Sequence, residues 1–374
     1  MTTKVEFETA TIAEAIKAAD RVAPTKGAAF DKAHGIVIEI DPGSSTVVVR
    51  STNGDLFYMS WVDHVAVEGE ATTWRVPSKV FTQVVTSLPY GTGKTVSFEE
   101  STKGQINMVC GRTKARFGLI HHADYPMWAA FDPDGLFPAS DLGGTIGMVE
   151  WAAAKVEIPL CGVHFDGKQV VATDRYRLVR VPLTISDLDR PITVPAGLLS
   201  QVIKQTGEVM IGTDGNQLLV MPDEYTQIRC VIFDEKYQNV ERVMSNHRDY
   251  PESVEFSRDS FVEVINRTMA FQGNGREVPL LRTFLGNEEI RVMMANKEQG
   301  MLGDVLEIAG QATHDMCEIK FTPKNLLDAL ANCPNDRIRM HYNPDRTNGL
   351  IYITSGTSFE VWVMPRAEVG ESNG

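Results

Sequence analysis

The chain has 374 residues, of which 43% are hydrophobic and 23% charged, so its composition is that of a folded globular protein and not of a disordered one. Its 36 Lys and Arg against 49 Asp and Glu leave a net charge of −13, which argues against a protein that binds nucleic acid through an overall basic surface, but not against one with a basic face inside an acidic shell. The five cysteines are scattered and contain no C-x-x-C pair, which excludes a cysteine zinc site and a disulfide framework. The sequence has neither the apolar core of a signal peptide nor an apolar run of about 18 residues, so we expect a cytoplasmic protein without membrane contact.

In chain order, the pattern predicts short strands and a few helices. Apolar residues at helical spacing predict a first helix, and Pro24 follows it as a stop signal. Runs of β-branched residues at 36–40 and 46–51, separated by turn residues, predict two strands. Amphipathic helices near residues 11–23, 143–155 and 258–270 each open one third of the chain.

One phrase occurs three times: a strand end, a proline and then an amphipathic helix. The copies begin at Val76-Pro-Ser, Val194-Pro-Ala and Phe321-Thr-Pro, at intervals of about 120 residues, and proline suits the first turn of a helix. A second phrase, Val48-Val-Arg-Ser-Thr, is echoed at the same period by Val170-Val-Ala-Thr-Asp. We therefore predict an α+β chain of three tandem domains of similar fold, each with two helices and about eight strands. The domains are residues 1–129, 130–249 and 250–374.

Two motifs resemble chemical sites without meeting their requirements. Gly91-Thr-Gly-Lys-Thr resembles a phosphate loop, but Leu88 stands where the first glycine belongs, and the motif follows a helix and precedes a strand. His121, His122 and Asp124 are possible metal ligands, but adjacent side chains of a strand point apart, which favours a solvated loop. With no G-x-S-x-G motif and no evident carboxylate pair, we expect a protein that is not an enzyme and holds no metal or cofactor.

Lysine and arginine slightly outnumber acidic residues on the predicted helices, although the chain as a whole is acidic. An ordinary solvated helix face explains this count better than a binding surface does, if the count is taken by itself.

Several phrases in order resemble the bacterial DNA polymerase sliding clamp of the β-subunit type, over nearly the whole chain. They are Arg75-Val-Pro-Ser-Lys-Val-Phe, Cys110-Gly-Arg-Thr-Lys-Ala-Arg-Phe-Gly-Leu, Val171-Ala-Thr-Asp-Arg-Tyr-Arg-Leu and the closing Val361-Trp-Val-Met-Pro-Arg. Gln238 and Val240 replace a proline and a tyrosine of the family, and Thr322 and Asn325 stand where the usual pocket has asparagine and tyrosine. These departures suit a divergent clamp, such as one encoded by a phage or plasmid, with a shifted preference for partner peptides.

The resemblance implies a DNA-clamp fold in which each domain packs two helices on two sheets and one chain forms half of a ring. It implies a head-to-tail homodimer that encircles duplex DNA without reading its sequence and tethers a DNA polymerase, loaded by a clamp-loader complex. Two alternatives remain: a three-domain enzyme with its site at a domain junction, and a monomeric processivity factor.

The resemblance also assigns three groups of residues. The partner-peptide pocket comprises Leu160, Thr173, Arg175, Tyr176, Arg177, Leu178, Arg242, Val243, Thr322, Asn325, Val363, Met364, Pro365 and Arg366. The DNA-facing residues are Lys26, from a loop, and the helical Lys17, Arg21, Lys79, Lys155, Lys204, Arg267 and Lys324. The dimer interface brings Phe117 and Leu119 of one chain to Met269 and Phe271 of the other.

Overall fold

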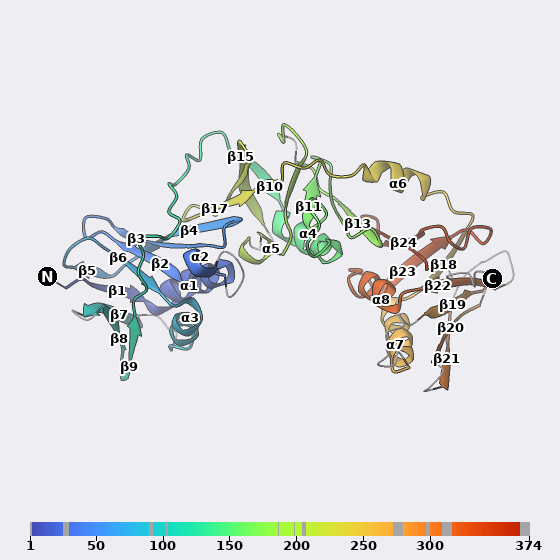
Figure 1. Ribbon diagram of the computed structural model, residues 1–374, viewed down its shortest axis with the longest axis horizontal. Helices are drawn as coiled ribbons and strands as arrows, with labels where there is room; N and C mark the ends of the chain where they lie inside the picture. The colour runs from blue at the N-terminus through green and yellow to red at the C-terminus, as the bar shows by residue number, and fades with distance from the viewer. Residues whose placement is uncertain are drawn as a thin grey trace, which may run out of the picture. The chain divides into compact units, whose positions relative to one another are not determined.

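A computed structural model of the chain describes residues 2–24, 30–89, 93–101, 104–185, 187–197, 199–203, 207–271, 280–286, 288–296, 300–308 and 316–366. The chain divides into two compact units (Figure 1). Unit 1 contains Met1–Gly147, Asp187–Asp189 and Val194–Asp234, and unit 2 contains Met148–Ser186, Arg190–Thr193 and Glu235–Gly374. The predicted division into three domains at residues 129 and 249 stays a prediction.

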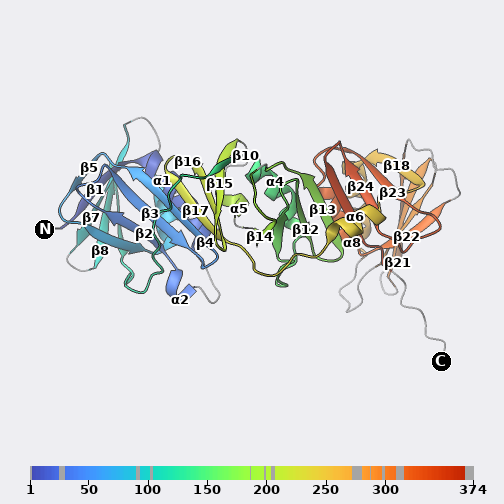
Figure 2. The same ribbon diagram turned by 90° about the horizontal axis from the view of Figure 1, so that it is seen from above.

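Unit 1 contains two antiparallel sheets. The five-stranded sheet has the order β5 (Ala66–Glu68), β1 (Lys4–Glu8), β7 (Thr95–Ser101), β8 (Gln105–Cys110) and β9 (Thr113–Gly118). The eight-stranded sheet has the order β10 (Phe137–Ser140), β15 (Glu208–Asp214), β16 (Gln217–Asp223), β17 (Thr226–Val231), β4 (Leu56–Asp63), β3 (Thr46–Thr52), β2 (Ile36–Ile40) and β6 (Thr72–Val76). Figure 2 shows β4 beside β17, so strands far apart in the sequence form one sheet.

The helices that the structure describes in unit 1 differ in length. They are α1 (Thr9–Val22), α2 (Phe30–Ala33), α3 (Ser78–Thr86), α4 (Leu142–Val149, which ends in unit 2) and α5 (Leu199–Val202). α1 and α3 lie side by side (Figure 1) and bury Ile12, Ile16 and Phe81 completely. A core of this kind stabilises the unit because burying each large apolar side chain contributes about 2 kcal/mol.

Unit 2 has the same layers of helices and antiparallel sheets. Its eight-stranded sheet has the order β14 (Ile192–Pro195), β11 (Gly162–Phe165), β12 (Gln169–Thr173), β13 (Arg177–Pro182), β25 (Phe359–Val363), β24 (Ile351–Ser355), β23 (Arg337–Tyr342) and β18 (Glu252–Ser257). Its four-stranded sheet has the order β21 (Gly300–Glu307), β20 (Glu289–Asn296), β19 (Leu281–Leu285) and β22 (Cys317–Phe321). The helices are the 3-10 helix η1 (Glu150–Ala152), α6 (Val240–Asn246), α7 (Arg258–Met269) and α8 (Pro323–Ala331), and α7 packs beside α8.

The predicted α+β class is confirmed, and most predicted helices form where expected. Helix α1 corresponds to the helix predicted near residues 11–23, and α7 corresponds to the helix predicted near residues 258–270. The phrases that contain Pro77 and Pro323 each pass from a strand end into a helix. The helix predicted at 143–155 is shorter, because α4 ends at Val149 and continues only as η1; its glycines are poor helix formers. No helix in the part of the chain that the structure describes is long and apolar enough to cross a membrane.

Candidate functional site

Two segments far apart in the sequence meet in the eight-stranded sheet of unit 2. β13 pairs with β25, so that Leu178 lies opposite Trp362. Just beyond the strands, the amide of Met364 donates a hydrogen bond to the carbonyl of Tyr176 at 2.8 Å. The two segments that supply most of the predicted pocket residues are therefore neighbours in one sheet.

A tight turn between β12 and β13 carries the predicted pocket residues Arg175 and Tyr176, and Thr173 and Arg177 flank it on the two strands. The Thr173 hydroxyl donates to the Arg177 carbonyl at 2.7 Å, and the Asp174 carboxylate accepts from the amides of Tyr176 and Arg177 at 3.0 and 2.8 Å. Arg175 has a φ of 75°, a left-handed conformation that costs a residue with a side chain about 1 kcal/mol or more. Such strain persists only where surrounding hydrogen bonds hold it, and it is enriched at functional sites.

Unit 1 contains the same turn between β3 and β4. The Thr52 hydroxyl donates to the Leu56 carbonyl at 2.8 Å, and the Asn53 side chain accepts from the Leu56 amide at 2.8 Å. Gly54, with a φ of 98°, occupies the position of Arg175. The two similar sequence phrases thus form the same turn. In unit 2 its left-handed position is occupied by Arg175, although this conformation favours glycine.

Arg177 is bound on several sides within unit 2. Its guanidinium pairs with Asp174 and with Asp328 of α8, both at 2.6 Å, and lies over the ring of Trp151 at 5.5 Å. The side chain is only 11% exposed. Arg177 therefore ties β13 to α8, and a peptide that used this guanidinium would have to share it with two carboxylates.

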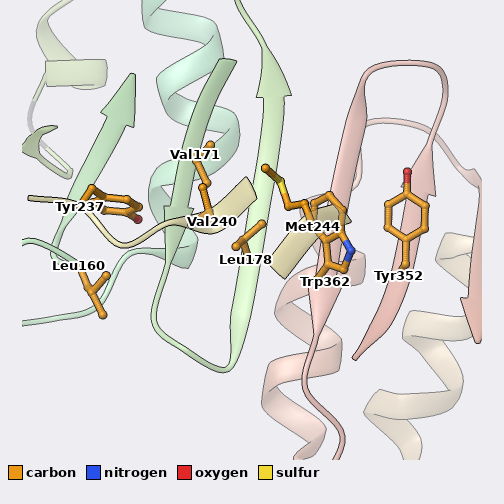
Figure 3. Packing of buried hydrophobic residues seen from close by; sticks show 8 residues of the cluster. All are labelled: Leu160, Val171, Leu178, Tyr237, Val240, Met244, Tyr352 and Trp362. Atoms are coloured by element: carbon orange, nitrogen blue, oxygen red, sulfur yellow. The ribbon is translucent and has the colours of Figure 1, made fainter. Parts of the chain in front are cut away.

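An apolar cluster lies beside this turn (Figure 3). Its members are Leu160, Val171, Leu178, Tyr237, Val240, Met244, Tyr352 and Trp362. The indole nitrogen of Trp362 donates to the His247 carbonyl at 2.9 Å, and its ring stacks on Tyr352 with centroids 4.9 Å apart. Of the cluster, only Leu160 and Leu178 belong to the pocket predicted from sequence. The spacing of Val240 and Met244, one helical turn apart, is the signal that predicts a buried helix face here.

The predicted pocket residues divide into an exposed rim and a buried floor. Tyr176 is 58% and Met364 43% exposed, and Arg175 and Arg242 are also exposed. The buried residues are Leu160, Thr173, Leu178, Val363 and Pro365, and the half-buried ones are Arg177, Val243, Thr322, Asn325 and Arg366.

A charged network borders the apolar cluster. The Glu360 carboxylate accepts hydrogen bonds from the Tyr352 hydroxyl at 2.5 Å and from Arg248 at 3.1 Å, and it pairs with Arg180. Burial alone would raise the pKa of Glu360, but the hydrogen bonds from Tyr352 and Arg180 outweigh it and hold the pKa below its usual range. Burial and the charge of Arg339 lower the pKa of His341 to about 4, so the ring that stacks on Tyr352 is uncharged at neutral pH.

The predicted DNA-facing residues of unit 1 lie on exposed helix faces. Lys17 and Arg21 are on the outer side of α1, one helical turn apart, and Lys79 is exposed in the first turn of α3. Arg21 donates to the Gln201 carbonyl. For Lys17 and Lys79 no ion pair is found within the described residues. Lys26 and Lys204 lie outside the described residues.

In unit 2 the corresponding cations are partly neutralised. Arg267 of α7 pairs with Asp304 at 2.7 Å and with Glu263 at 3.8 Å, and Lys324 of α8 pairs with Asp328 at 3.0 Å. Lys155 is exposed in the loop after η1.

The residues predicted for the dimer contact lie on or beside sheet edges. Phe117 is on β9, the edge strand of the five-stranded sheet, but its side chain is buried against Phe81 with ring centroids 4.9 Å apart, whereas Lys114 and Arg116 of the same strand are exposed. Leu119 follows β9 and is half-buried. Met269 and Phe271 are half-buried at the end of α7, which packs on the edge strand β21.

The alternative chemical motifs occupy ordinary positions. His121 and His122 are exposed in a loop, and the described ranges contain no group of three His, Cys, Asp or Glu side chains placed to hold a metal ion. The glycine-rich motif lies between α3 and β7, as the predicted helix-to-strand order requires, although Gly91 and Thr92 lie outside the described residues.

No protein-family model and no curated protein sequence matches the chain. Solved structures match it along its whole length. The DNA polymerase III beta subunit of Thermotoga maritima has a TM-score of 0.85 at 18% identity, over 98% of this chain and 99% of that one. The Pseudomonas aeruginosa sliding clamp bound to griselimycin has a TM-score of 0.82 at 18% identity, over 98% and 100%. The Bacillus subtilis DNA polymerase sliding clamp also scores 0.82, at 17% identity, over 98% and 100%.

The fold of this chain is therefore that of a DNA sliding clamp. The proteins that it resembles include bacterial DNA polymerase III beta subunits, as the sequence phrases predicted, and the low identity agrees with a divergent sequence.

Proposed function

We propose that the chain is a DNA sliding clamp, which encircles duplex DNA as a head-to-tail homodimer and tethers a DNA polymerase for processive synthesis. The observation that carries the proposal is the match to sliding clamps over 98% of this chain and nearly all of theirs. A clamp needs no catalytic residue, metal or cofactor, because encirclement supplies the attachment. Its partners would be duplex DNA, a DNA polymerase and a clamp-loader complex, in the cytoplasm.

Two unpaired strand edges support the ring. β9 and β21 end their sheets within the described residues, and strands at such edges carry free backbone groups that pair readily with another chain. A contact between β9 of one copy and β21 of the next is heterologous, and two copies would close it into a ring. Leu119, Met269 and Phe271 would flank that contact.

The exposed cations of α1 and α3 would face DNA. Phosphate contacts of lysine are independent of base sequence and weaken with salt, which suits a protein that must slide. Within the described residues Lys17 and Lys79 make no ion pair like those of Arg267 and Lys324, so unit 1 would contribute most of the attraction. The remaining candidates are Arg21, Lys155, Lys26 and Lys204.

The turn and apolar cluster of unit 2 would bind partner peptides. The rim residues Tyr176, Arg242 and Met364 are exposed and chemically varied, and methionine adapts to different ligands. Thr322 at the N-terminal cap of α8, Asn325 on α8 and Gln238 before α6 would shift the peptide preference from that of a typical clamp.

The decisive experiment uses the purified chain and nicked circular DNA. Dimers would be diluted to monomers and concentrated again with the circle, so that some rings close around it. We expect a light-scattering mass of two 41.4 kDa chains, and protein that stays on the circle in high salt until the DNA is linearised. A monomer mass at micromolar concentration, or equal retention on circular and linear DNA, contradicts the proposal.

Reversing two charges should weaken the contact with DNA and leave the fold intact. In the Lys17→Glu, Lys79→Glu variant, we expect the magnitude of the slope of log affinity against log salt to fall by up to about 4 for a short labelled duplex, because each of the two chains in the ring loses two phosphate contacts. Lys168→Glu, an exposed change in the turn between β11 and β12, is the control and should leave the slope nearer the wild type. If Lys168→Glu has the same effect as the double variant, α1 and α3 do not face DNA.

A further inference from the structure

A cavity of about 380 Å³ lies in unit 1 between α1 and the eight-stranded sheet. Helix α1 packs on β4 (Figure 1), and its lining residues share one face of the helix because they recur at helical spacing. These residues are Thr11, Glu14, Ala15 and Ala18. The sheet lines the other side with residues of β4 and of the hairpin formed by β16 and β17. The short side chains of the two alanines leave this space unfilled.

Three aromatic side chains belong to the walls of this cavity. Tyr58 is 3% exposed and Trp61 is half-buried, whereas Tyr225 is 47% exposed. The Trp61 amide donates to the Tyr225 carbonyl at 2.9 Å, so the end of β4 and the hairpin are held side by side. Aromatic rings attract cations that lie over their faces, which makes these walls suited to an organic cation.

The charged side chains that line the cavity are all carboxylates. They belong to Glu14 on α1, Asp63 at the end of β4 and Asp223 at the end of β16. Glu14 and Asp63 are exposed, and among the described residues neither makes an ion pair. In that part of the chain no lysine, arginine or histidine lines the cavity, so an incoming cation would find negative charge on the helix and on the sheet.

The pKa values of two tyrosines reflect this negative charge. Burial and the charge of Asp223 raise the pKa of Tyr58 to about 12, and the charges of Glu224 and Asp63 raise the pKa of Tyr225. The carboxylates are not placed as metal ligands, since the described ranges contain no group of three His, Cys, Asp or Glu side chains that could hold a metal ion. Negative charge distributed around aromatic walls suits a cation larger than a metal ion.

We propose that this cavity is a partner site, separate from the peptide site of unit 2, and that it binds the guanidinium of an arginine side chain on a partner protein. A guanidinium is planar, stacks on aromatic rings and donates two parallel hydrogen bonds to a carboxylate, so it matches these walls better than a lysine ammonium does. The net charge of −13 attracts basic partners, and the exposed Tyr225 offers contact to the chain that carries the arginine. All lining residues belong to unit 1, so the inference does not depend on the clamp function.

The test uses the full-length chain labelled with 5-fluorotryptophan, in which Trp61→Phe identifies the fluorine signal of Trp61. The probe is the capped tripeptide Gly-Arg-Gly, and its control has the uncharged isostere citrulline in place of arginine. We expect the arginine peptide to shift the Trp61 signal to saturation and to bind at least about tenfold more tightly than the citrulline peptide, which lacks the charge. No shift of the Trp61 signal, or equal binding of the two peptides, overturns the proposal.

Two neutral substitutions locate the contact within the cavity. Glu14→Gln and Asp63→Asn each remove one exposed carboxylate, and each should weaken binding of the arginine peptide about threefold. Glu99→Gln, an exposed change on β7, should bind as the wild type does. A loss in Glu99→Gln as large as in the other two, or no loss in any variant, overturns the cavity as the site.

The source of the cation is tested with two further probes, the free diamine putrescine and the capped tripeptide Gly-Lys-Gly. Both should bind more weakly than the arginine peptide, because neither has the planar fork of a guanidinium. If either binds as tightly as the arginine peptide, the assignment to an arginine of a partner protein is wrong.

Discussion

Replacing Arg177 by methionine is expected to lower the free energy of unfolding of unit 2 by about 3 kcal/mol. The guanidinium is nearly buried between two carboxylates, Asp174 and Asp328, each 2.6 Å away. Removing it takes away the cation that both carboxylates share, so that Asp328 keeps only its pair with the exposed Lys324, and it removes the contact with the ring of Trp151. Urea denaturation, followed by hydrogen exchange of peptides from β13 and α8, measures the loss in this unit.

The neighbouring arginine provides a matched control for that substitution. Arg175→Met removes a side chain that is 64% exposed and pairs with the exposed Glu157, so the expected loss is below about 1 kcal/mol. Equal losses for the two variants would show that the pairs of Arg177 contribute no more than a surface ion pair.

Replacing Arg75 by methionine should destabilise unit 1 by a similar amount, about 3 kcal/mol. Arg75 is 3% exposed and donates to the carbonyls of Lys32, His34 and His121 at 2.8 to 2.9 Å. Its guanidinium also lies over Tyr125 at 4.9 Å. Methionine fills much of the space but loses the three hydrogen bonds from a charged donor, each of which contributes about 1 kcal/mol or more.

Arg75→Lys and Arg112→Met separate hydrogen bonding from charge in that experiment. Lysine keeps the charge but lacks the planar fork that reaches three carbonyls, so an intermediate loss is expected. Arg112 is exposed in the turn between β8 and β9, and its replacement should change stability by no more than about 0.5 kcal/mol. A loss for Arg75→Met as small as that for Arg112→Met would contradict this role for Arg75.

Arg177 illustrates how far sequence reasoning reaches at the candidate site. The resemblance of the phrase around it assigned Thr173, Arg175, Tyr176, Arg177 and Leu178 to a partner pocket, and the structure places Arg175 and Tyr176 on a turn between β12 and β13. Its partner Asp328 is 151 residues away, and no local pattern predicts that contact. The resemblance assigned Arg177 to a peptide pocket, which stays a prediction, and the structure adds the two carboxylates that its guanidinium contacts.

The elements themselves were determined locally. The helical spacing of apolar residues predicted α1 and α7, and the proline phrases predicted the starts of α3 and α8, because helix periodicity and the fixed φ of proline act over a few residues. The repetition of these signals along the chain indicated tandem similar folds and the resemblance to a clamp.

Only the tertiary structure decided which surfaces stay open. It paired β17 with β4 and β13 with β25, buried Phe117, and seated Met244 on the floor that the sequence had left for a partner. The two strand pairings join segments more than 100 residues apart, and even Phe117 packs on Phe81 from a different element of the unit. The free energy of burying an apolar side chain depends on which residues pack against it in three dimensions, and the sequence of a short segment does not specify those residues.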